Sequence, residues 1–179
     1  MPAENPHVYA MTDRKPLLFV DVDGVISLFG FAPSERDSPG AFHWIDGVAH
    51  CIPRESGRRL MRLAEHFELV WATGWEHKAN EHLPFILELP FENLPCLEFA
   101  GNAVFGSTHW KVDAIEAYAG DRPAAWIDDN HGDASRMWAL DRETPTLLVE
   151  TSCATGMTDE HVDDLIGWAE SVAQAVPAA

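Results

Sequence analysis

The sequence predicts an α/β fold in which helices cover both faces of an open, mainly parallel β-sheet. The first reason is that four short and almost uninterrupted apolar runs recur along the chain, at residues 17–20, 69–72, 124–127 and 146–149. Such runs are typical of strands that are buried on both faces, as in a parallel sheet. The second reason is that segments with helical spacing of apolar residues lie between these runs. This alternation implies right-handed crossovers between parallel strands.

The first strand is expected at Leu17–Val20, and the segment after it departs from the alternation. Residues 25–53 contain several glycines and prolines, followed by the sequence FHWI-DG-VAHC. Two short runs joined by Asp-Gly predict a hairpin that turns at Asp46 and Gly47. We interpret residues 25–53 as a flap beside the first strand, because the segment is too short for a separate domain.

Helices are expected wherever apolar residues recur on one helical face, as they do at Leu60, Leu63 and Phe67. The last helix has a plausible start at Thr158, which two acidic residues follow. The four expected helices cover residues 54–67, 75–89, 110–119 and 158–172. We therefore expect one domain over residues 16–172, with loosely ordered ends at residues 1–15 and 173–179.

Composition limits the classes of partner and compartment. The 179 residues are 46% hydrophobic, which suffices for one core, and the formal net charge of −17 repels nucleic acid backbones and anionic membranes. Three cysteines without a paired motif fit neither a disulfide framework nor a zinc site, and they favour a reducing compartment. No secretory signal or membrane-spanning run is found, so we expect a cytoplasmic protein that does not bind membranes. No feature decides the oligomeric state.

Polar side chains follow three of the expected strands at the point where each strand ends. In open parallel sheets, ligands bind in the crevice at the carboxyl ends of the strands. These side chains should therefore meet at one edge of the sheet. They are Asp21 and Asp23 after the first run, Thr73 and Gly74 after the second, and Asp128, Asp129 and Asn130 after the third.

Each of these residues alone could simply cap a helix or a turn. A calcium loop of the EF-hand type is excluded, because Gly24 stands at the wrong position after Asp21 and no closing Glu follows. Several carboxylates can share one dry edge if a hard cation neutralises them. Magnesium takes such oxygen ligands, so Asp21 together with Asp128, Asp129 or both predicts a Mg²⁺ site.

The segments FVDVDG, WATG, Lys111 and WIDDN resemble, in this order, the four motifs of the haloacid dehalogenase (HAD) superfamily. The resemblance runs from about Pro16 to the last helix and implies a Rossmann-like fold. An aspartate at position 23 is similar to the phosphatase branch of the superfamily. Neither of the usual insertion points is long enough for a folded cap, so the chain resembles the capless members, whose open sites often accept macromolecules or bulky phosphates.

The resemblance implies a magnesium-dependent phosphatase. Asp21 would be the nucleophile that forms an aspartyl-phosphate, and Asp23 would be the general acid and base. Thr73, Gly74 and Lys111 would hold the phosphoryl group, with Lys78 as a local alternative to Lys111. The metal would be held by Asp21, by the backbone carbonyl of Asp23 and by Asp129, with Asp128 in support, although the assignment within the pair Asp128 and Asp129 stays open.

The substrate is less defined. The segments DVDGVIS and VWATGWEHKAN look similar to HAD domains associated with bacterial RNA-repair proteins, which raises removal of phosphate from a nucleic acid end. A basic stripe of Arg54, Arg58 and Arg62 could assist, although a solvated face balanced by acidic residues is the simpler interpretation.

Other possible substrate contacts are Trp44 and Trp75, which could stack on a base, and Asn130. A phosphate-binding or regulatory module without turnover is a further alternative. The presence of both Asp21 and Asp23 favours an enzyme, since binding alone needs no proton donor.

Overall fold

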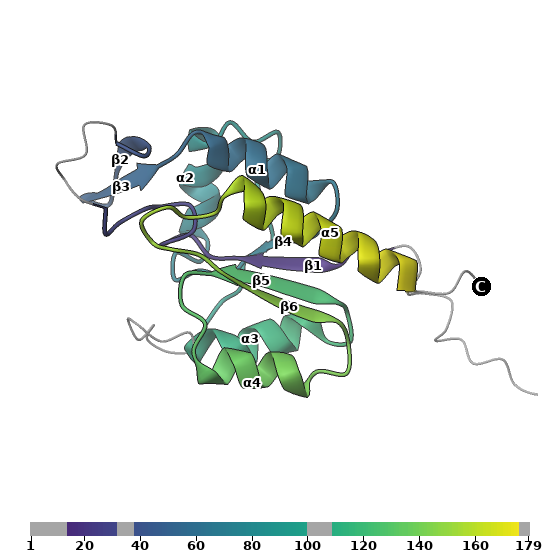
Figure 1. Ribbon diagram of the computed structural model, residues 1–179. Helices are drawn as coiled ribbons and strands as arrows, with labels where there is room; N and C mark the ends of the chain where they lie inside the picture. Colours follow the sequence, from purple (N-terminus) through teal and green to yellow (C-terminus); the bar gives the residue numbers. More distant parts are fainter. Residues whose placement is uncertain (1–13, 32–37, 100–108, 176–179) are drawn as a thin grey trace, which may run out of the picture.

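A four-stranded parallel sheet forms the centre of the protein, as the apolar runs predict (Figure 1). The structure is a computed structural model, and it describes residues 14–31, 38–99 and 109–175. All three strand pairs of the sheet are parallel, in the order β4-β1-β5-β6. The strands are β1 (Leu17–Val20), β4 (Glu68–Trp71), β5 (Ala124–Asp128) and β6 (Thr146–Glu150).

Helices cover both faces of this sheet, which confirms the expected layer order (Figure 1). One face carries α1 (Glu55–Ala64), α2 (Lys78–Ile86) and α5 (Asp159–Ala175), and the other carries α3 (His109–Ala119) and α4 (Asp133–Asp141). Successive strand side chains point to opposite faces, so each strand supplies two cores. In β1, Leu18 and Val20 pack with α1, α2 and α5, whereas Leu17 and Phe19 pack with α3 and α4.

The expected hairpin is present between β1 and α1. It consists of β2 (Ala41–Ile45) and β3 (Val48–Ile52), which pair antiparallel. Its turn residues Asp46 and Gly47 have φ angles of 50° and 79°, the left-handed pair that a two-residue hairpin turn favours. Among the described residues between β1 and α1, the chain forms this hairpin and its connections and no folded cap.

Several features differ from the expected helices. Helix α1 ends at Ala64 and α2 ends at Ile86, before the expected ends at residues 67 and 89. The sequence analysis missed α4, because it buries only Ser135 and Trp138 and so lacks a helical stripe of apolar residues. The helix expected from residue 75 begins later, at Lys78, since Glu76 adopts a left-handed conformation with φ 47°. Helix α5 continues to Ala175.

The expected loose ends fall largely outside the described residues, namely at residues 1–13 and 176–179. Residues 173–175, expected in the tail, belong to α5. Within the described parts of the chain, none of the helices combines the length and the apolar character that a membrane span requires.

Candidate active site

The carboxyl ends of β1 and β5 bring the acidic residues of two motifs together. The two strands are neighbours, with Val20 opposite Ile127, so Asp21 and Asp128 follow in adjacent positions. The register continues past β1, where the backbone N–H of Asp21 donates to the carbonyl of Ile127 at 3.1 Å. Parallel pairing thus places two motifs that are about a hundred residues apart in sequence at one edge.

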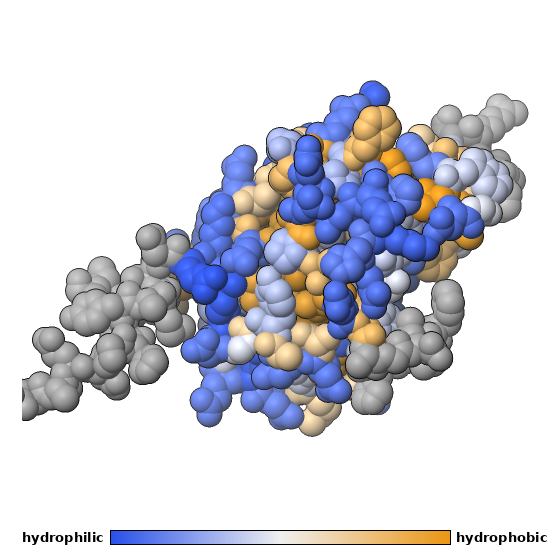
Figure 2. All heavy atoms as spheres, turned by 180° about the vertical axis from the view of Figure 1, so that it is seen from behind, coloured by the Kyte–Doolittle hydropathy of each residue, from blue (hydrophilic) through white to orange (hydrophobic). Residues whose placement is uncertain are grey.

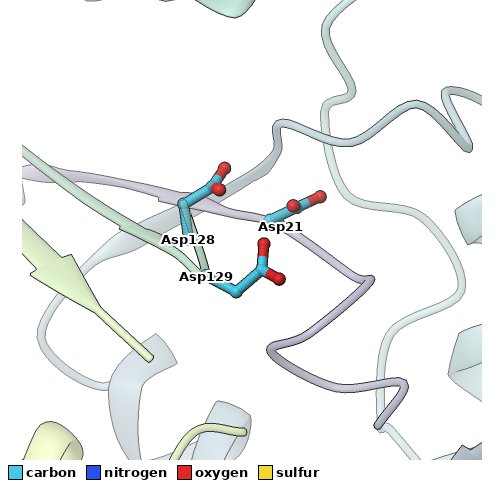
Figure 3. Close-up of side chains that lie close together, drawn as sticks. All are labelled: Asp21, Asp128 and Asp129. Atoms are coloured by element: carbon cyan, nitrogen blue, oxygen red, sulfur yellow. The ribbon is translucent and has the colours of Figure 1, made fainter. Parts of the chain in front are cut away.

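Three carboxylates gather at this edge (Figure 3). One oxygen each from Asp21, Asp128 and Asp129 lies within 4.8 Å of the others. Gly24 makes the approach of Asp129 possible, because a Cβ atom at position 24 would lie 2.3 Å from Asp129 Oδ2. Its φ of +75° also favours glycine. Oxygen atoms this close together suit a hard divalent cation.

Lys111 of α3 places its ammonium group between two of these carboxylates. The Nζ atom lies 2.8 Å from Asp21 Oδ2 and 2.7 Å from Asp128 Oδ2, and the residue is only 3% exposed. Lys78, the alternative in the sequence analysis, is exposed and pairs with Asp46 at the hairpin turn. The structure therefore brings Lys111, and not Lys78, to Asp21.

Asp128 is the most extensively bonded carboxylate of the three. Its Oδ2 accepts hydrogen bonds from Lys111 Nζ and from the indole N–H of Trp126 at 3.1 Å. Its Oδ1 accepts the backbone N–H of Asn130 at 3.1 Å. These donors occupy both oxygens and fix Asp128 as a support for Lys111.

Burial raises the pKa of Asp21 to about 6, against the opposing effect of Lys111. Burial also raises the pKa values of Asp128 and Asp129. For Lys111, burial alone would lower the pKa, but the carboxylates of Asp21 and Asp128 outweigh it and raise the pKa above its usual value. One permanent cation therefore faces three crowded carboxylates, and a divalent cation would favour their ionised forms.

Asp23 lies at the same edge but in a different environment. Its side chain is 53% exposed, and its Oδ2 accepts a hydrogen bond from the indole N–H of Trp75 at 3.0 Å. The Trp75 ring meets the ring of His50 edge to face, with centroids 4.6 Å apart, and His50 Nδ1 lies 4.0 Å from Asp23 Oδ1. Ser27 is hydrogen-bonded to the same His50 nitrogen at 2.9 Å. Asp23 is thus held by the turn after β4 and by the hairpin.

Thr73 and Gly74 follow β4, the other neighbour of β1. Thr73 is buried, and its Oγ1 accepts the backbone N–H of Trp75 at 3.3 Å. Gly74 is exposed. The second motif therefore lies at the same edge as Asp21, and its hydroxyl also shapes the turn that carries Trp75.

A cavity of about 650 Å³ opens onto Asp21 and Asp23. Of the three possible substrate contacts, Asn130 lines it, whereas Trp44 and Trp75 are not among its lining residues. Trp44 lies on β2 and is 76% exposed. The described residues that line the cavity are Asp21, Asp23, Ser27, Leu28, Phe29, Val48, Ala49, His50, Asp129 and Asn130.

Sequence reasoning missed the contributions of Ser27, His50 and Trp126. Trp126 stands inside the WIDDN segment, next to the residue it supports, so that motif contained a signal. His50 and Ser27 carry no such signal, because only the folding of the hairpin against the turn after β4 brings them to Asp23.

The arginines that could have formed a basic stripe are paired with carboxylates, in line with the simpler interpretation of a balanced face. Arg58 pairs with Asp159 at 2.9 Å, and Arg62 pairs with Asp163 at 2.6 Å, both on α5. Arg54 lies 3.9 Å from Glu88. Arg58 and Arg62 thus join α1 to α5, whereas Arg54 is exposed beside its carboxylate partner.

Comparison with known proteins agrees with this arrangement. The model of a family described as the HAD domain in Swiss Army Knife RNA repair proteins matches residues 17–162. The chain belongs to this family. This membership makes it a domain of the HAD superfamily, in a family that is described from RNA repair proteins. The four ordered motifs and the Rossmann-like sheet of this HAD domain accord with the family.

No curated protein matches this HAD domain. Among solved structures, a hypothetical protein from Xanthomonas campestris aligns over 99% of this chain and 100% of its own, with 15% identity and a TM-score of 0.43. That similarity is too weak to indicate a function.

Proposed function

We propose that this HAD domain is a magnesium-dependent phosphomonoesterase that works through an aspartyl-phosphate on Asp21. The observation that carries the proposal is the placement of Asp21. Its Oδ2 is paired with Lys111, it clusters with Asp129, and it lines one cavity together with Asp23. A nucleophile and a proton donor thus line one cavity, and a cation for the phosphoryl charge is paired with the nucleophile from behind the cavity wall.

In the first half of the reaction, a carboxylate oxygen of Asp21 attacks phosphorus and the bond to the leaving oxygen breaks. Asp23 gives a proton to that oxygen, a role that its position at the cavity suits. In the second half, Asp23 takes a proton from water, which attacks the aspartyl-phosphate and releases phosphate and free Asp21. Lys111, Thr73 and the backbone of Gly74 bind the phosphoryl oxygens.

The donor set fits Mg²⁺, since one oxygen from each of three carboxylates lies within 4.8 Å of the others and, among the described residues, Lys111 is the cation paired with Asp21. We assign the ion to Asp21, Asp129 and the backbone carbonyl of Asp23. The hydrogen bonds to both oxygens of Asp128 support its role in holding Lys111. When bound, Mg²⁺ neutralises charge on the phosphoryl group and orients it.

Asp21→Asn is expected to abolish phosphate release from a small aryl phosphate, because the amide is a poor nucleophile of nearly the same size. Malachite green detection with Mg²⁺ and with EDTA measures the loss, and circular dichroism checks the fold. The exposed Asp121, in the turn after α3, provides the matched control Asp121→Asn, which should keep full activity. Turnover in Asp21→Asn, or none in the folded wild type, would contradict the proposal.

A nucleic acid end is the second candidate substrate, and the RNA-repair description of the family favours it. An enzyme that contacts several phosphates of its substrate loses affinity steeply as salt increases. The KM for an RNA oligonucleotide with a terminal phosphate, measured between low and physiological salt, therefore tests this candidate.

A further inference from the structure

The cavity at Asp21 and Asp23 has an apolar wall that the phosphoryl chemistry does not use. Besides the carboxylates, the cavity is lined by Leu28 and Phe29, and by Val48 at the start of β3. Phe29 is 49% exposed and Val48 is 56% exposed, so both present apolar surface. Seen from behind, hydrophilic side chains dominate the surface, and apolar side chains are visible at the hairpin end (upper right) as well as across the middle of this face (Figure 2).

Backbone hydrogen bonds anchor this wall to the domain. The N–H of Leu28 donates to the carbonyl of Cys51 in β3 at 2.8 Å, and the N–H of Phe29 donates to the carbonyl of Cys153 at 2.9 Å. At the turn of the hairpin, Asp46 pairs with Lys78 of α2. The wall is therefore preformed, which reduces the conformational entropy that the protein loses when a ligand binds.

Almost all of the described lysines and arginines are ion-paired with carboxylates. Apart from Arg14 and Lys15, every lysine and arginine in the described ranges forms an ion pair. Arg14 and Lys15 precede β1, so they lie at the edge of the sheet opposite Asp21. Binding along a chain of phosphates depends on lysines and arginines that replace counterions, and none of the described residues that line the cavity is a lysine or an arginine.

We infer that the wall formed by Leu28, Phe29 and Val48 binds a single apolar ring next to the phosphomonoester, and that the site recognises no further phosphate. A volume of about 650 Å³ is within the range of pockets that hold one small organic ligand. The ring could be an aryl group or the base of a terminal nucleotide, which share a flat apolar face. This inference rests on the proposed phosphatase function and names the substrate class of the same site.

The test compares two esters that have similar leaving groups, benzyl phosphate and ethyl phosphate, in the wild type and in Phe29→Ser. Loss of ring contact should lower kcat/KM for benzyl phosphate about tenfold, with little change for ethyl phosphate, because only the first ester reaches the wall. Val48→Ser should act in the same direction. The matched control is Phe85→Ser on α2, since Phe85 is 90% exposed and lies outside the cavity. An equal loss on both esters would overturn the inference.

A second experiment distinguishes the two possible origins of the ring, a small aryl ester and the base of a terminal nucleotide. A 3′-mononucleotide and an RNA oligonucleotide with the same terminal nucleotide should give similar kcat/KM values with a flat salt dependence. A much higher kcat/KM for the oligonucleotide, which falls as the salt concentration rises, would overturn the claim that the site recognises one ring and no further phosphate. If the mononucleotide and the oligonucleotide are both hydrolysed slowly and benzyl phosphate is hydrolysed efficiently, the inference is supported. The ring that the wall binds is then that of a small aryl ester.

A binding measurement tests the wall independently of the proposed phosphatase function. If no ester is turned over, the proposed function fails, but calorimetry with benzyl phosphonate and ethyl phosphonate still examines the wall. Tighter binding of the benzyl compound, reduced by Phe29→Ser, would support the wall in a chain without turnover. Equal binding of the two phosphonates would overturn it.

Discussion

At the scale of single residues, the site depends on side chains that are held by one specific partner. Lys111 is buried between Asp21 and Asp128, so removing it would leave two buried carboxylates without a counter-charge. Asp23 is half-exposed and depends on Trp75 for its orientation. The sequence analysis named Trp75 as a residue that could stack on a base, and in the structure its indole N–H donates a hydrogen bond to Asp23.

Trp75→Phe is expected to lower kcat about tenfold, because it keeps the ring and removes the hydrogen bond that holds Asp23. The loss should be larger for ethyl phosphate than for 4-nitrophenyl phosphate, since a poor leaving group depends more on the proton that Asp23 donates. Steady-state kinetics on both esters measure the difference. Trp168→Phe, in α5, is the matched control. Equal losses on the two esters would argue for a structural role alone.

At the scale of helices and strands, close backbone contacts set the positions of the elements that frame the site. Gly57 of α1 lies against the chain after α2, where an added Cβ would be 2.1 Å from the carbonyl oxygen of Leu87. Helix α1 is also joined to α5 by Arg59, which donates to Asp159 at 3.1 Å and to the carbonyl of Met157 at 2.8 Å. These contacts hold the helices that cover one face of the sheet.

Two glycine substitutions in helices should have opposite signs. Gly167→Ala in α5 meets open space and should stabilise the protein by about 0.5–1 kcal/mol, the usual helical gain over glycine. Gly57→Ala should instead destabilise it, because the backbone of Leu87 obstructs the new methyl group. Urea unfolding of both variants gives the free energies. A gain in stability for Gly57→Ala would show that α1 and α2 can move apart freely.

The α1–α5 contact should weaken in acid. The hydrogen bond from Arg59 lowers the pKa of Asp159. A lowered folded-state pKa stabilises the protein above the unfolded-state value of about 3.9, and this stabilisation is lost as the pH falls through the folded-state pKa. We therefore expect Asp159→Asn to unfold at lower urea concentration than the wild type at neutral pH, with the gap closing as the pH falls well below about 3.9. If the difference in unfolding midpoint between the two proteins did not change with pH, the ionisation of Asp159 would be excluded as its cause.

At the scale of the whole molecule, a net charge of −17 coexists with a site built for phosphate chemistry. Most of the described cations are paired with carboxylates, either at the surface, where they join α1 to α5, or in the site, where Lys111 offsets Asp21. An anionic substrate therefore meets little long-range attraction. A bound divalent cation would add positive charge where the phosphoryl group must approach.

Millimolar Mg²⁺ should raise the thermal midpoint of the wild type by a few degrees. At ten times the dissociation constant, binding to the folded state contributes about 1.4 kcal/mol, or about 4 °C for a domain of this size. Differential scanning calorimetry with Mg²⁺ and with EDTA measures the shift. Asp129→Asn should abolish it and Asp121→Asn should not. A shift retained in Asp129→Asn would place the ion elsewhere.

The sequence by itself determined the four strands, because residues buried on both faces must be apolar, and it determined the strand ends at which polar residues collect. It also determined the hairpin, since Asp-Gly suits a tight left-handed turn. It did not reveal α4, whose buried face is too small to leave an apolar pattern.

Only the tertiary structure decided the partners across the site. The order β4-β1-β5-β6 places Asp21 between the ends of its two neighbours, and the docking of α3 brings Lys111 to it in place of Lys78. The bond between Trp75 and Asp23, and the wall at Phe29, depend on how the hairpin folds back. Apolar periodicity is local and can be read along the chain, whereas these contacts join segments that only strand order and helix packing bring together.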